Sequence, residues 1–426
     1  MARVGSDRAR SPESPDESPD ERLDATGCVV VPGLVNAHHH LLQSAFRTGP
    51  DTRHVPMSDW LVAMRRRYDA TGVDAALAAA AAAVGLAESM LCGVTTVADH
   101  HLTWPDSVDA CTEIAAATVG AARRLGARLV FVRGSAADDP NVAAASAEAL
   151  CRVIEPDAMV QLAVGPAGVH SDRRETFEAF ADVARRYGLR RRTQANEQVD
   201  VAIALDRYGR RPIDLLEEWG WLDTDVTLAH LCAVTDDEIA RLAERGVTAT
   251  HAPGCDLPQG WGVSPVAALR RAGIAVGLGT SGGGSNDAGH LLADARLAMQ
   301  IAPLAGGASS TSGSSRALTA ALTARDVLTM ATRGSSLGLG RDDLGCIEPG
   351  KAADLCCYDM SGVSDAGVED RLAALVWTSP GRRPRHVVVG GRVVVRDHRL
   401  VTDDEATIAA DLMDLLGSRR KEYLNV

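Results

Sequence analysis

The sequence lacks any apolar run near the roughly 18–20 residues that a membrane-spanning helix needs. Its most apolar stretch, Ala75–Leu86, is a short alanine-rich segment. It also lacks an excess of basic charge, because 44 Lys and Arg residues face 56 Asp and Glu residues and give a net charge of −12. An acidic surface repels phosphate backbones. These absences predict a protein that works neither in a membrane nor on a nucleic acid.

The nine cysteines lack the spacing of a zinc finger, a redox motif or a disulfide framework, and Cys356 and Cys357 are adjacent. An odd number of cysteines without a signal-peptide pattern predicts reduced thiols and a cytoplasmic protein. The first expected strand is not followed by a G-x-G-x-x-G fingerprint, and its absence argues against a dinucleotide-binding fold.

The chain does contain a regular alternation of short β-branched runs and longer helical segments, with 46% apolar residues over 426 positions. This alternation is typical of βαβ units, and eight repeats favour a closed barrel over an open sheet. The predicted fold class is α/β, a (β/α)8 TIM barrel. The expected strands are Val29–Ala37, Val94–Asp99, Arg128–Val132, Met159–Val164, Leu189–Asn196, Val226–Leu231, Val247–His251 and Ile274–Gly279, and the expected helices between them include Asp74–Leu91, Val108–Leu125, Arg174–Tyr187, Asp236–Arg245 and Val266–Ala272.

The two ends of the chain differ in character from this barrel. Residues 1–22 are acidic and proline-rich and hold too few large apolar side chains to offset the entropy of ordering, so we expect a disordered tail. The barrel is expected over residues 23–345, with a Gly/Ser loop at 306–315. Residues 346–426 predict a small β appendage with a hairpin at Gly390-Gly391, closed by a helix from Asp404 to Arg420.

Ionisable side chains gather at the carboxyl ends of the expected strands, where the reacting groups of such a barrel lie. His38 and His40 share one face of a strand, a spacing that suits either two ligands of one metal ion or a hydrogen-bonded pair. Glu197 is either a proton carrier with a pKa raised by burial or an exposed loop charge. The other candidates are His230, as a site residue or a satisfied core histidine; Asp99, which orients a histidine or caps a turn; and Ser281, which no nucleophile elbow supports as a nucleophile.

Motifs in order along nearly the whole chain resemble those of the amidohydrolase superfamily. They begin with VVVPGLVNAHHHLLQSAFR and continue through MSDWL, GVTTVADHH, ANEQVD, TLAHL, THAPG, GLGTSGGGSND and EPGKAADL. HHH, DHH and SND are similar to the branch that contains 8-oxoguanine deaminases, guanine deaminases and triazine hydrolases. The resemblance implies a barrel with a small β-sandwich, and hydrolysis of a nitrogen heterocycle by metal-activated water.

Carried over onto this chain, the resemblance implies that a divalent zinc or iron is held by His38 and His40. It implies that Glu197 and His230 move protons. The residues expected to bind the substrate are His101, Trp104, Gln194, Trp261 and Asn286.

Two ligand positions depart from the family pattern. Gln194 stands where the family has a histidine on the fifth strand, and Ser281 stands where it has an aspartate on the eighth. Neither side chain is a good zinc ligand. Arg192 adds a positive charge where a cation would otherwise lie. We therefore expect either a rebuilt metal site or a site without metal.

These observations leave three functions open. The first is hydrolytic deamination, or hydrolysis of another C–N bond, of a small nitrogen heterocycle, and the overall resemblance favours it. The second is a metal-independent enzyme that uses Glu197, His230, Asp99 and Arg192 for acid–base chemistry in an elimination, cyclisation or isomerisation. The third is a catalytically silent relative. Because the N-terminal half of the β-sandwich is mostly absent, exposed strand edges predict a homodimer.

Overall fold

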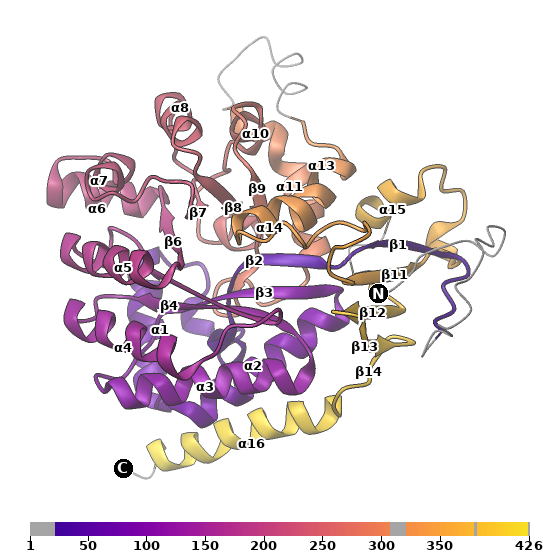
Figure 1. Ribbon diagram of the computed structural model, residues 1–426, viewed down its shortest axis with the longest axis horizontal. Coiled ribbons are helices and arrows are strands. Elements are labelled where there is room, and N and C mark those ends of the chain that lie inside the picture. Colours follow the sequence, from indigo (N-terminus) through magenta and orange to yellow (C-terminus); the bar gives the residue numbers. More distant parts are fainter. Residues whose placement is uncertain (1–21, 307–320, 379–380, 425–426) are drawn as a thin grey trace.

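The computed structural model describes residues 22–306, 321–378 and 381–424. The predicted disordered tail, except for Arg22, and most of the predicted Gly/Ser loop lie outside the described residues. The described chain forms a ring of parallel strands with helices around it, and a small antiparallel sheet lies to one side (Figure 1).

Nine parallel strands form the central sheet, in the order β10-β2-β3-β4-β5-β6-β7-β8-β9. Only Gly279 and Thr280 separate β9 from β10, and β10 pairs with β2 through the register Ser281↔His39. The sheet therefore closes on itself, and the predicted (β/α)8 barrel is confirmed. Its strands are β2 (Leu34–His40), β3 (Val94–His101), β4 (Arg128–Ser135), β5 (Val160–Pro166), β6 (Arg190–Ala195), β7 (Val226–His230), β8 (Thr248–His251), β9 (Val276–Leu278) and β10 (Ser281–Gly282).

Helices connect the strands and cover the outside of the barrel (Figure 1). Local signals set their ends: the Ser107 side chain accepts from the N–H of Ala110 at the start of α3, and Gly126 ends that helix with φ 75°. The helices are α1 (Met57–Thr71), α2 (Ala75–Leu91), α3 (Val108–Leu125), α4 (Pro140–Val153), α5 (Arg174–Tyr187), α6 (Gln198–Tyr208), α7 (Pro212–Glu218), α8 (Asp236–Glu244), α9 (Pro253–Asp256), α10 (Val266–Arg271), α11 (Leu291–Ile301), α13 (Ala324–Thr329), α14 (Ser335–Gly338), α15 (Arg371–Trp377) and α16 (Glu405–Leu424), with short 3-10 or π segments η1 (Leu41–Ala45), η2 (Pro50–Thr52), η3 (Ala302–Gly306), η4 (Met330–Gly334) and η5 (Val363–Asp365).

The small sheet has five antiparallel strands in the order β1-β11-β12-β13-β14. The predicted hairpin is confirmed, because β12 pairs with β13 across Gly390 and Gly391. Their φ angles of 56° and 86° are the positive values that a tight two-residue turn requires. The strands are β1 (Cys28–Pro32), β11 (Leu355–Asp359), β12 (His386–Val389), β13 (Arg392–Arg396) and β14 (Arg399–Leu400).

The run Val29–Ala37, predicted as one barrel strand, is divided at Gly33 between the two sheets. Its first part pairs with β11 of the small sheet, and its second part pairs with β3 of the barrel. A Cβ atom on Gly33 would lie 2.3 Å from Oγ1 of Thr95, so glycine allows the close passage from one sheet to the other. The small sheet is thus built from both ends of the chain and not from the C-terminal region alone.

A buried ion pair joins the two sheets. The guanidinium of Arg128, on β4, donates from Nε and Nη2 to the two carboxylate oxygens of Asp354, at 3.2 and 2.8 Å. The backbone N–H of Gly390 donates to the same carboxylate at 2.7 Å. Because both charged side chains are at most 3% exposed, each needs the other to offset its desolvation.

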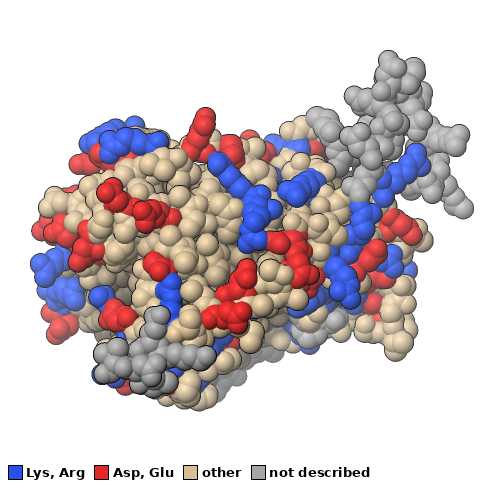
Figure 2. Space-filling model, turned by 90° about the horizontal axis from the view of Figure 1, so that it is seen from below, with Lys and Arg blue, Asp and Glu red and all other residues tan. Residues whose placement is uncertain are grey.

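Three features of the outer part of the molecule concern its expected partners: its helices, its surface charges and the end strands of the small sheet. Among the described residues, no single helix is long and apolar enough to cross a membrane, and α1 with α2 passes that test only as a pair bent by 120°. On the face shown in Figure 2, acidic and basic side chains are interspersed. The end strands of the small sheet are β1 and β14, and the homodimer expected from such edges stays a prediction.

Candidate active site

The carboxyl ends of the parallel strands bring histidines from β2, β3 and β7 into one buried cluster. The ring centroids of His38 and His40 lie 4.8 Å apart, and those of His38 and His230 lie 5.1 Å apart. The ring of His100 stacks against His40 at 6.0 Å. Because all strands of the barrel run in parallel, side chains far apart in the sequence meet at this end.

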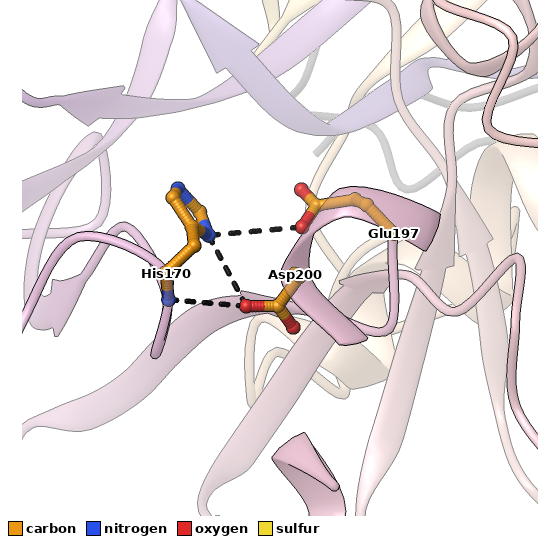
Figure 3. Close-up of side chains that lie close together, drawn as sticks. All are labelled: His170, Glu197 and Asp200. Carbon is orange, nitrogen blue, oxygen red and sulfur yellow. Dashed lines mark hydrogen bonds and ion pairs between the residues drawn. The ribbon is translucent and has the colours of Figure 1, made fainter. Parts of the chain in front are cut away.

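Glu197 lies at the turn between β6 and α6, close to His170 and Asp200 (Figure 3). Its side chain is 0% exposed, and neither carboxylate oxygen has a hydrogen-bond partner in the described part of the chain. Oε2 lies 3.8 Å from Nδ1 of His170, and Oε1 lies 3.9 Å from Nε2 of His230. Burial raises the pKa of Glu197 to about 7, although both histidines act to lower it. Glu197 is therefore not the exposed loop charge of the alternative reading.

His170, in the loop after β5, is a site residue that the sequence reasoning missed. Its Nδ1 lies 3.3 Å from Oδ1 of Asp200, which also accepts the backbone N–H of His170 at 3.1 Å. Burial acts to lower the pKa of His170, but Asp200 and Glu197 more than offset it and raise the pKa to about 9. Two signals were present in the sequence: His170 follows the end of β5 by four residues, and Asp200 lies one helical turn after Glu197.

His230 is held from both of its ring nitrogens. Nδ1 lies 2.6 Å from Oδ1 of Asp256, and Nε2 lies 2.9 Å from Oε1 of Gln194. Burial acts to lower the pKa of His230, but Asp256 and Glu197 raise it above its ordinary value. Burial acts in the opposite sense on Asp256, and His230 with His251 holds its pKa at about 2. Asp256, on the short helix α9, was also missed by the sequence reasoning.

The backbone at these strand ends adopts angles that are costly for non-glycine residues. His230, Leu231, Asn196 and Ser281 have φ values of 75°, 54°, 56° and 55°. Left-handed angles in side-chain-bearing residues persist only where surrounding contacts hold them, and they cluster at functional sites. Four such residues at one end of the barrel mark that end as the candidate site.

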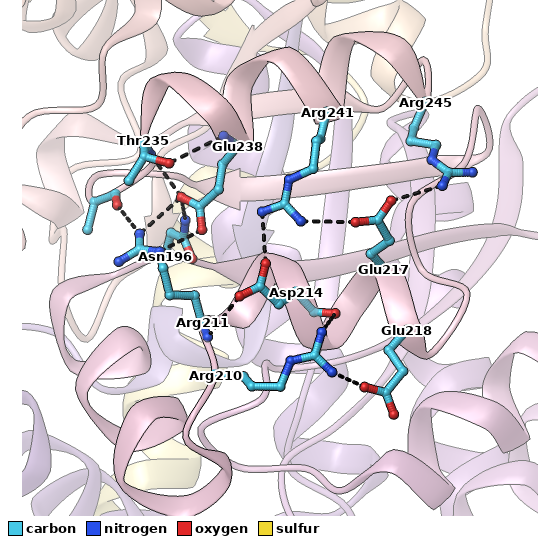
Figure 4. A network of polar contacts seen from close by, with 11 residues as sticks. Asn196, Arg210, Arg211, Asp214, Glu217, Glu218, Thr235, Glu238, Arg241 and Arg245 are labelled. Atoms are coloured by element: carbon cyan, nitrogen blue, oxygen red, sulfur yellow. Dashed lines mark hydrogen bonds and ion pairs between the residues drawn. The ribbon is translucent and has the colours of Figure 1, made fainter.

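A network of charged side chains holds Asn196, next to Glu197, in this conformation (Figure 4). The Asn196 side chain donates to Glu238 at 3.0 Å, and its backbone N–H donates to Asp200 at 2.9 Å. Glu238 is only 1% exposed and accepts from Nε of Arg211 at 2.7 Å. The network therefore fixes the turn from which Glu197 projects.

His38 and His40 are both neutral imidazoles. Burial lowers the pKa of His40 to about 4, although its Nδ1 hydrogen-bonds to the carbonyl of His100 at 2.6 Å. Burial also lowers the pKa of His38 far below its ordinary value, with contributions from His40 and His230. Because a carbonyl only accepts, Nδ1 of His40 carries the proton and Nε2 has a free lone pair. Nε2 of His38 is buried without a hydrogen-bond partner in the described chain.

These two imidazoles do not complete a metal site. Among the described residues, one set of three His, Cys, Asp or Glu ligand atoms lies within 4.8 Å of one another, and it consists of His170, Glu197 and Asp200. The oxygens of Asp200 in that set already accept hydrogen bonds from His170 and from the backbone of Asn196. A tightly bound zinc ion takes three or four protein ligands. The donor set around His38 therefore does not fit the zinc or iron implied by the sequence resemblance.

Arg192 is a buried residue of β6 whose hydrogen bonds within the described chain go to the backbone and to none of the acid–base side chains. Its guanidinium donates to the backbone carbonyls of Ala37 and, at 3.5 Å, Gly338. Within the described ranges no carboxylate pairs with it, and burial lowers the pKa of Arg192 to about 9. This placement does not support a catalytic role for Arg192 through direct contact with Glu197. Arg192 is instead a buried positive charge that helps to lower the pKa of His38 and of His100.

The remaining candidates on β3 serve different purposes. Asp99 accepts the backbone N–H of Leu41 at 2.8 Å, which is the turn-capping alternative, and burial raises its pKa to about 7. Nε2 of His101 hydrogen-bonds to the carbonyl of Thr103, and its ring packs 4.4 Å from that of Trp104. The indole N–H of Trp104 donates to the carbonyls of His101 and Gly134. His101 and Trp104 thus pack against each other, and the guanidinium of Arg133 lies 4.4 Å from the centroid of the Trp104 ring.

Trp261, Asn286 and Ser281 complete the predicted set. The Trp261 ring meets that of His230 edge to face at 5.0 Å, and its buried Nε1 has no hydrogen-bond partner among the described residues. The Asn286 amide is engaged by the carbonyl of Thr280 at 3.0 Å and by Asp294 at 3.1 Å. The backbone carbonyl of Ser281 hydrogen-bonds to Nδ1 of His39. The structure therefore brings Trp261 to the site and uses the Asn286 amide to support a loop.

Comparison with known proteins agrees with the resemblance seen in the motifs. A model of the amidohydrolase family matches residues 29–394. The chain is 32% identical over 407 residues to an 8-oxoguanine deaminase from Pseudomonas aeruginosa, covering 91% of this chain and 87% of the relative. It is 33% identical over 398 residues to a 5-methylthioadenosine/S-adenosylhomocysteine deaminase from Halobacterium salinarum, covering 91% and 86%.

Among solved structures, the chain is similar to an atrazine chlorohydrolase from Arthrobacter aurescens complexed with zinc. The two are 36% identical and superpose with a TM-score of 0.85 over 92% of this chain and 88% of that one. The same barrel with a small accessory sheet is therefore present in a protein that binds zinc.

Proposed function

The chain belongs to the amidohydrolase family, and from this premise we propose that it hydrolyses a carbon–nitrogen bond at a ring carbon of a small nitrogen heterocycle, with release of ammonia. One observation carries the proposal: Glu197 is fully buried, unpartnered, and flanked by His170 and His230 at 3.8 and 3.9 Å. A structural carboxylate would be hydrogen-bonded at this depth.

Glu197 is placed to carry a proton in both directions. A carboxyl group whose pKa is about 7 is partly ionised at neutral pH, so it takes and returns a proton with little cost. In the proposed reaction it removes a proton from water as the water oxygen bonds to the ring carbon. It then gives that proton to the departing amine, so that water and the amino-substituted ring yield the hydroxyl-substituted ring and ammonia.

His170 and His230 stabilise the charge that this addition creates. Each is paired with a buried aspartate, Asp200 for the first and Asp256 for the second, and each has a raised pKa. When water adds to the heterocycle, negative charge develops on the ring, and fixed positive charges in a buried site lower its energy. The two histidines also lower the pKa of Glu197, so that part of it is ionised at neutral pH.

The walls of the site suit a planar ring. The Trp261 ring packs edge to face against His230 at 5.0 Å and adds an aromatic surface to the site. The unpartnered indole N–H of Trp261 is a donor for a ring nitrogen or carbonyl oxygen of the substrate. The names of the relatives agree with this class, since they are deaminases of 8-oxoguanine and of 5-methylthioadenosine or S-adenosylhomocysteine, and a hydrolase of atrazine.

The proposal is tested by incubating the purified full chain with a panel of aminopurines, aminopteridines and aminotriazines and measuring the ammonia released. We expect at least one of these to be deaminated, and we expect Glu197→Gln to abolish that activity. The matched control is Glu244→Gln, which changes an exposed glutamate on α8 and should leave the activity intact. Turnover of none of the panel, or unchanged turnover by Glu197→Gln, would contradict the proposal.

A second candidate function is favoured by the incomplete donor set around His38 and His40. The same acid–base residues would then catalyse an elimination, cyclisation or isomerisation, in which water is not a reactant. Tracing the oxygen of water into the product separates this reading from hydrolysis.

A further inference from the structure

The place of the family's third metal ligand is occupied by an amide whose orientation is fixed. Nε2 of Gln194 donates to the backbone carbonyl of Ala167 at 3.2 Å, so its Oε1 faces Nε2 of His230 at 2.9 Å. An amide oxygen only accepts hydrogen bonds, so Nε2 of His230 must donate. The lone pair that a metal or a water nucleophile would meet at this nitrogen is replaced by an N–H.

The second ring nitrogen of His230 also donates. Nδ1 lies 2.6 Å from Oδ1 of Asp256, a short contact typical of a charge-assisted hydrogen bond. The other oxygen of Asp256 lies 3.4 Å from Nδ1 of His251, so the carboxylate is held from two sides. An imidazole that donates from both nitrogens carries a positive charge.

A divalent cation beside His38 would meet repulsion without enough ligands. His230 lies 5.1 Å from His38 ring to ring, and the buried guanidinium of Arg192 acts on His38 from the barrel interior. His38 and His40 supply two neutral donors, while Gln194 and Ser281 supply neither charge nor a strong ligand. The aspartate that would offset two positive charges in the family site is absent here, because position 281 is a serine.

We infer that this chain holds no resident divalent metal beside His38 and His40, and that Gln194 instead fixes His230 as a two-donor cation whose charge takes the place of the metal's. Gln194 is a positioning residue that acts through His230. The inference does not depend on which heterocycle the enzyme uses, since it concerns the charge of the site before any substrate binds.

The first test measures zinc, iron and manganese in the untagged full chain by plasma mass spectrometry, before and after incubation with each ion and desalting. We expect far less than one ion per chain in every case. The variant Gln194→His combined with Ser281→Asp should retain close to one zinc per chain, with a rise in melting temperature that a chelator reverses. Native protein that retains one ion per chain, and loses that ion in His38→Ala, would overturn the inference.

The second test measures the effect of Gln194 on the protonation of His230 and does not need the double variant. In 15N-histidine-labelled protein, long-range nitrogen spectra report which ring nitrogens of His230 are protonated, with His230→Gln used to assign its signals. We expect both nitrogens to be protonated in the native chain at neutral pH. Gln194→Met, which removes the acceptor, should release one of these protons, and Gln194→Glu, which keeps an acceptor, should not. A native His230 with one bare nitrogen would overturn the inference.

Discussion

Oε1 of Gln194 lies 2.9 Å from Nε2 of His230, and the two residues project from the neighbouring parallel strands β6 and β7. This contact decides the character of the site, because it turns a nitrogen that could bind a metal or a water into a hydrogen-bond donor. Glu197, 3.9 Å from the same nitrogen, keeps both carboxylate oxygens free of hydrogen bonds within the described residues.

The activity should depend on pH through Glu197. The carboxylate must be ionised to take a proton from water, so kcat/KM should fall as the pH drops through about 7, the pKa of Glu197. His170 lowers that pKa by its positive charge, so His170→Gln should move the acid limb of the profile to higher pH. The control His54→Gln changes an exposed histidine and should leave the limb in place. A limb that stays fixed, or moves to lower pH, in His170→Gln would contradict this assignment.

Asp256→Asn should cost far more activity than stability. The amide keeps a hydrogen bond to His230 but removes the negative charge that raises the pKa of His230. Loss of one group that stabilises developing charge lowers rates by about 10²–10³-fold. We expect a fall in kcat of that order in steady-state kinetics, and little change for Asp237→Asn on the exposed side of α8. A kcat within a fewfold of native would show that the charge on His230 does not contribute.

Asn196 tests whether the turn before Glu197 must be held. Asn196→Ala keeps a Cβ atom at φ 56° but removes the side-chain hydrogen bond that Asn196 donates to Glu238. Glu238 is then left with one donor fewer. The left-handed angle costs about 1–2 kcal/mol for alanine. Asn196→Gly loses the same hydrogen bond without that cost. Urea unfolding should therefore rank native above glycine above alanine, and both variants should lower kcat because the position of Glu197 is less well fixed. Equal stability of the two variants would contradict the strain argument.

Removing the carboxylate of the buried ion pair between the two sheets should destabilise the protein more than removing the carboxylate of an exposed pair. Asp354→Ala leaves the guanidinium of Arg128 buried without its counter-ion, although the hydrogen bond to the carbonyl of Ala158 remains, and this costs about 3–5 kcal/mol. Asp69→Ala breaks an exposed pair with Arg65 and should cost about 0–1 kcal/mol. Chemical denaturation followed by circular dichroism gives both values. Similar losses in the two variants would show that the sheets do not depend on this contact.

The barrel could be predicted from the sequence because each strand is a short apolar run followed by a long helix, and the polar strand ends follow from the parallel arrangement. His38, His40, Glu197 and His230 were found in this way. The division at Gly33 could not be predicted, since apolar residues continue on both sides of it and only the approach of Thr95 requires the break.

The partners of the central residues were harder to predict. His170 lies in a loop four residues beyond β5, and Asp256 lies in a four-residue helix after β8. Neither position is marked by periodicity, because each depends on how a loop turns back over the barrel. For Gln194 the sequence indicated a lost ligand, but the direction of its amide depends on the carbonyl of Ala167 across a neighbouring loop.

The central claim, that Glu197 passes a proton between water and a departing amine, is tested most directly by running the reaction in oxygen-18 water. Mass spectrometry of the product and an ammonia assay on the same sample report whether water enters the ring as the amine leaves. The account predicts one oxygen-18 atom in each product molecule, ammonia in equal amount, and neither in Glu197→Gln. A product formed without oxygen-18 would contradict it and would identify the site as one for elimination, cyclisation or isomerisation.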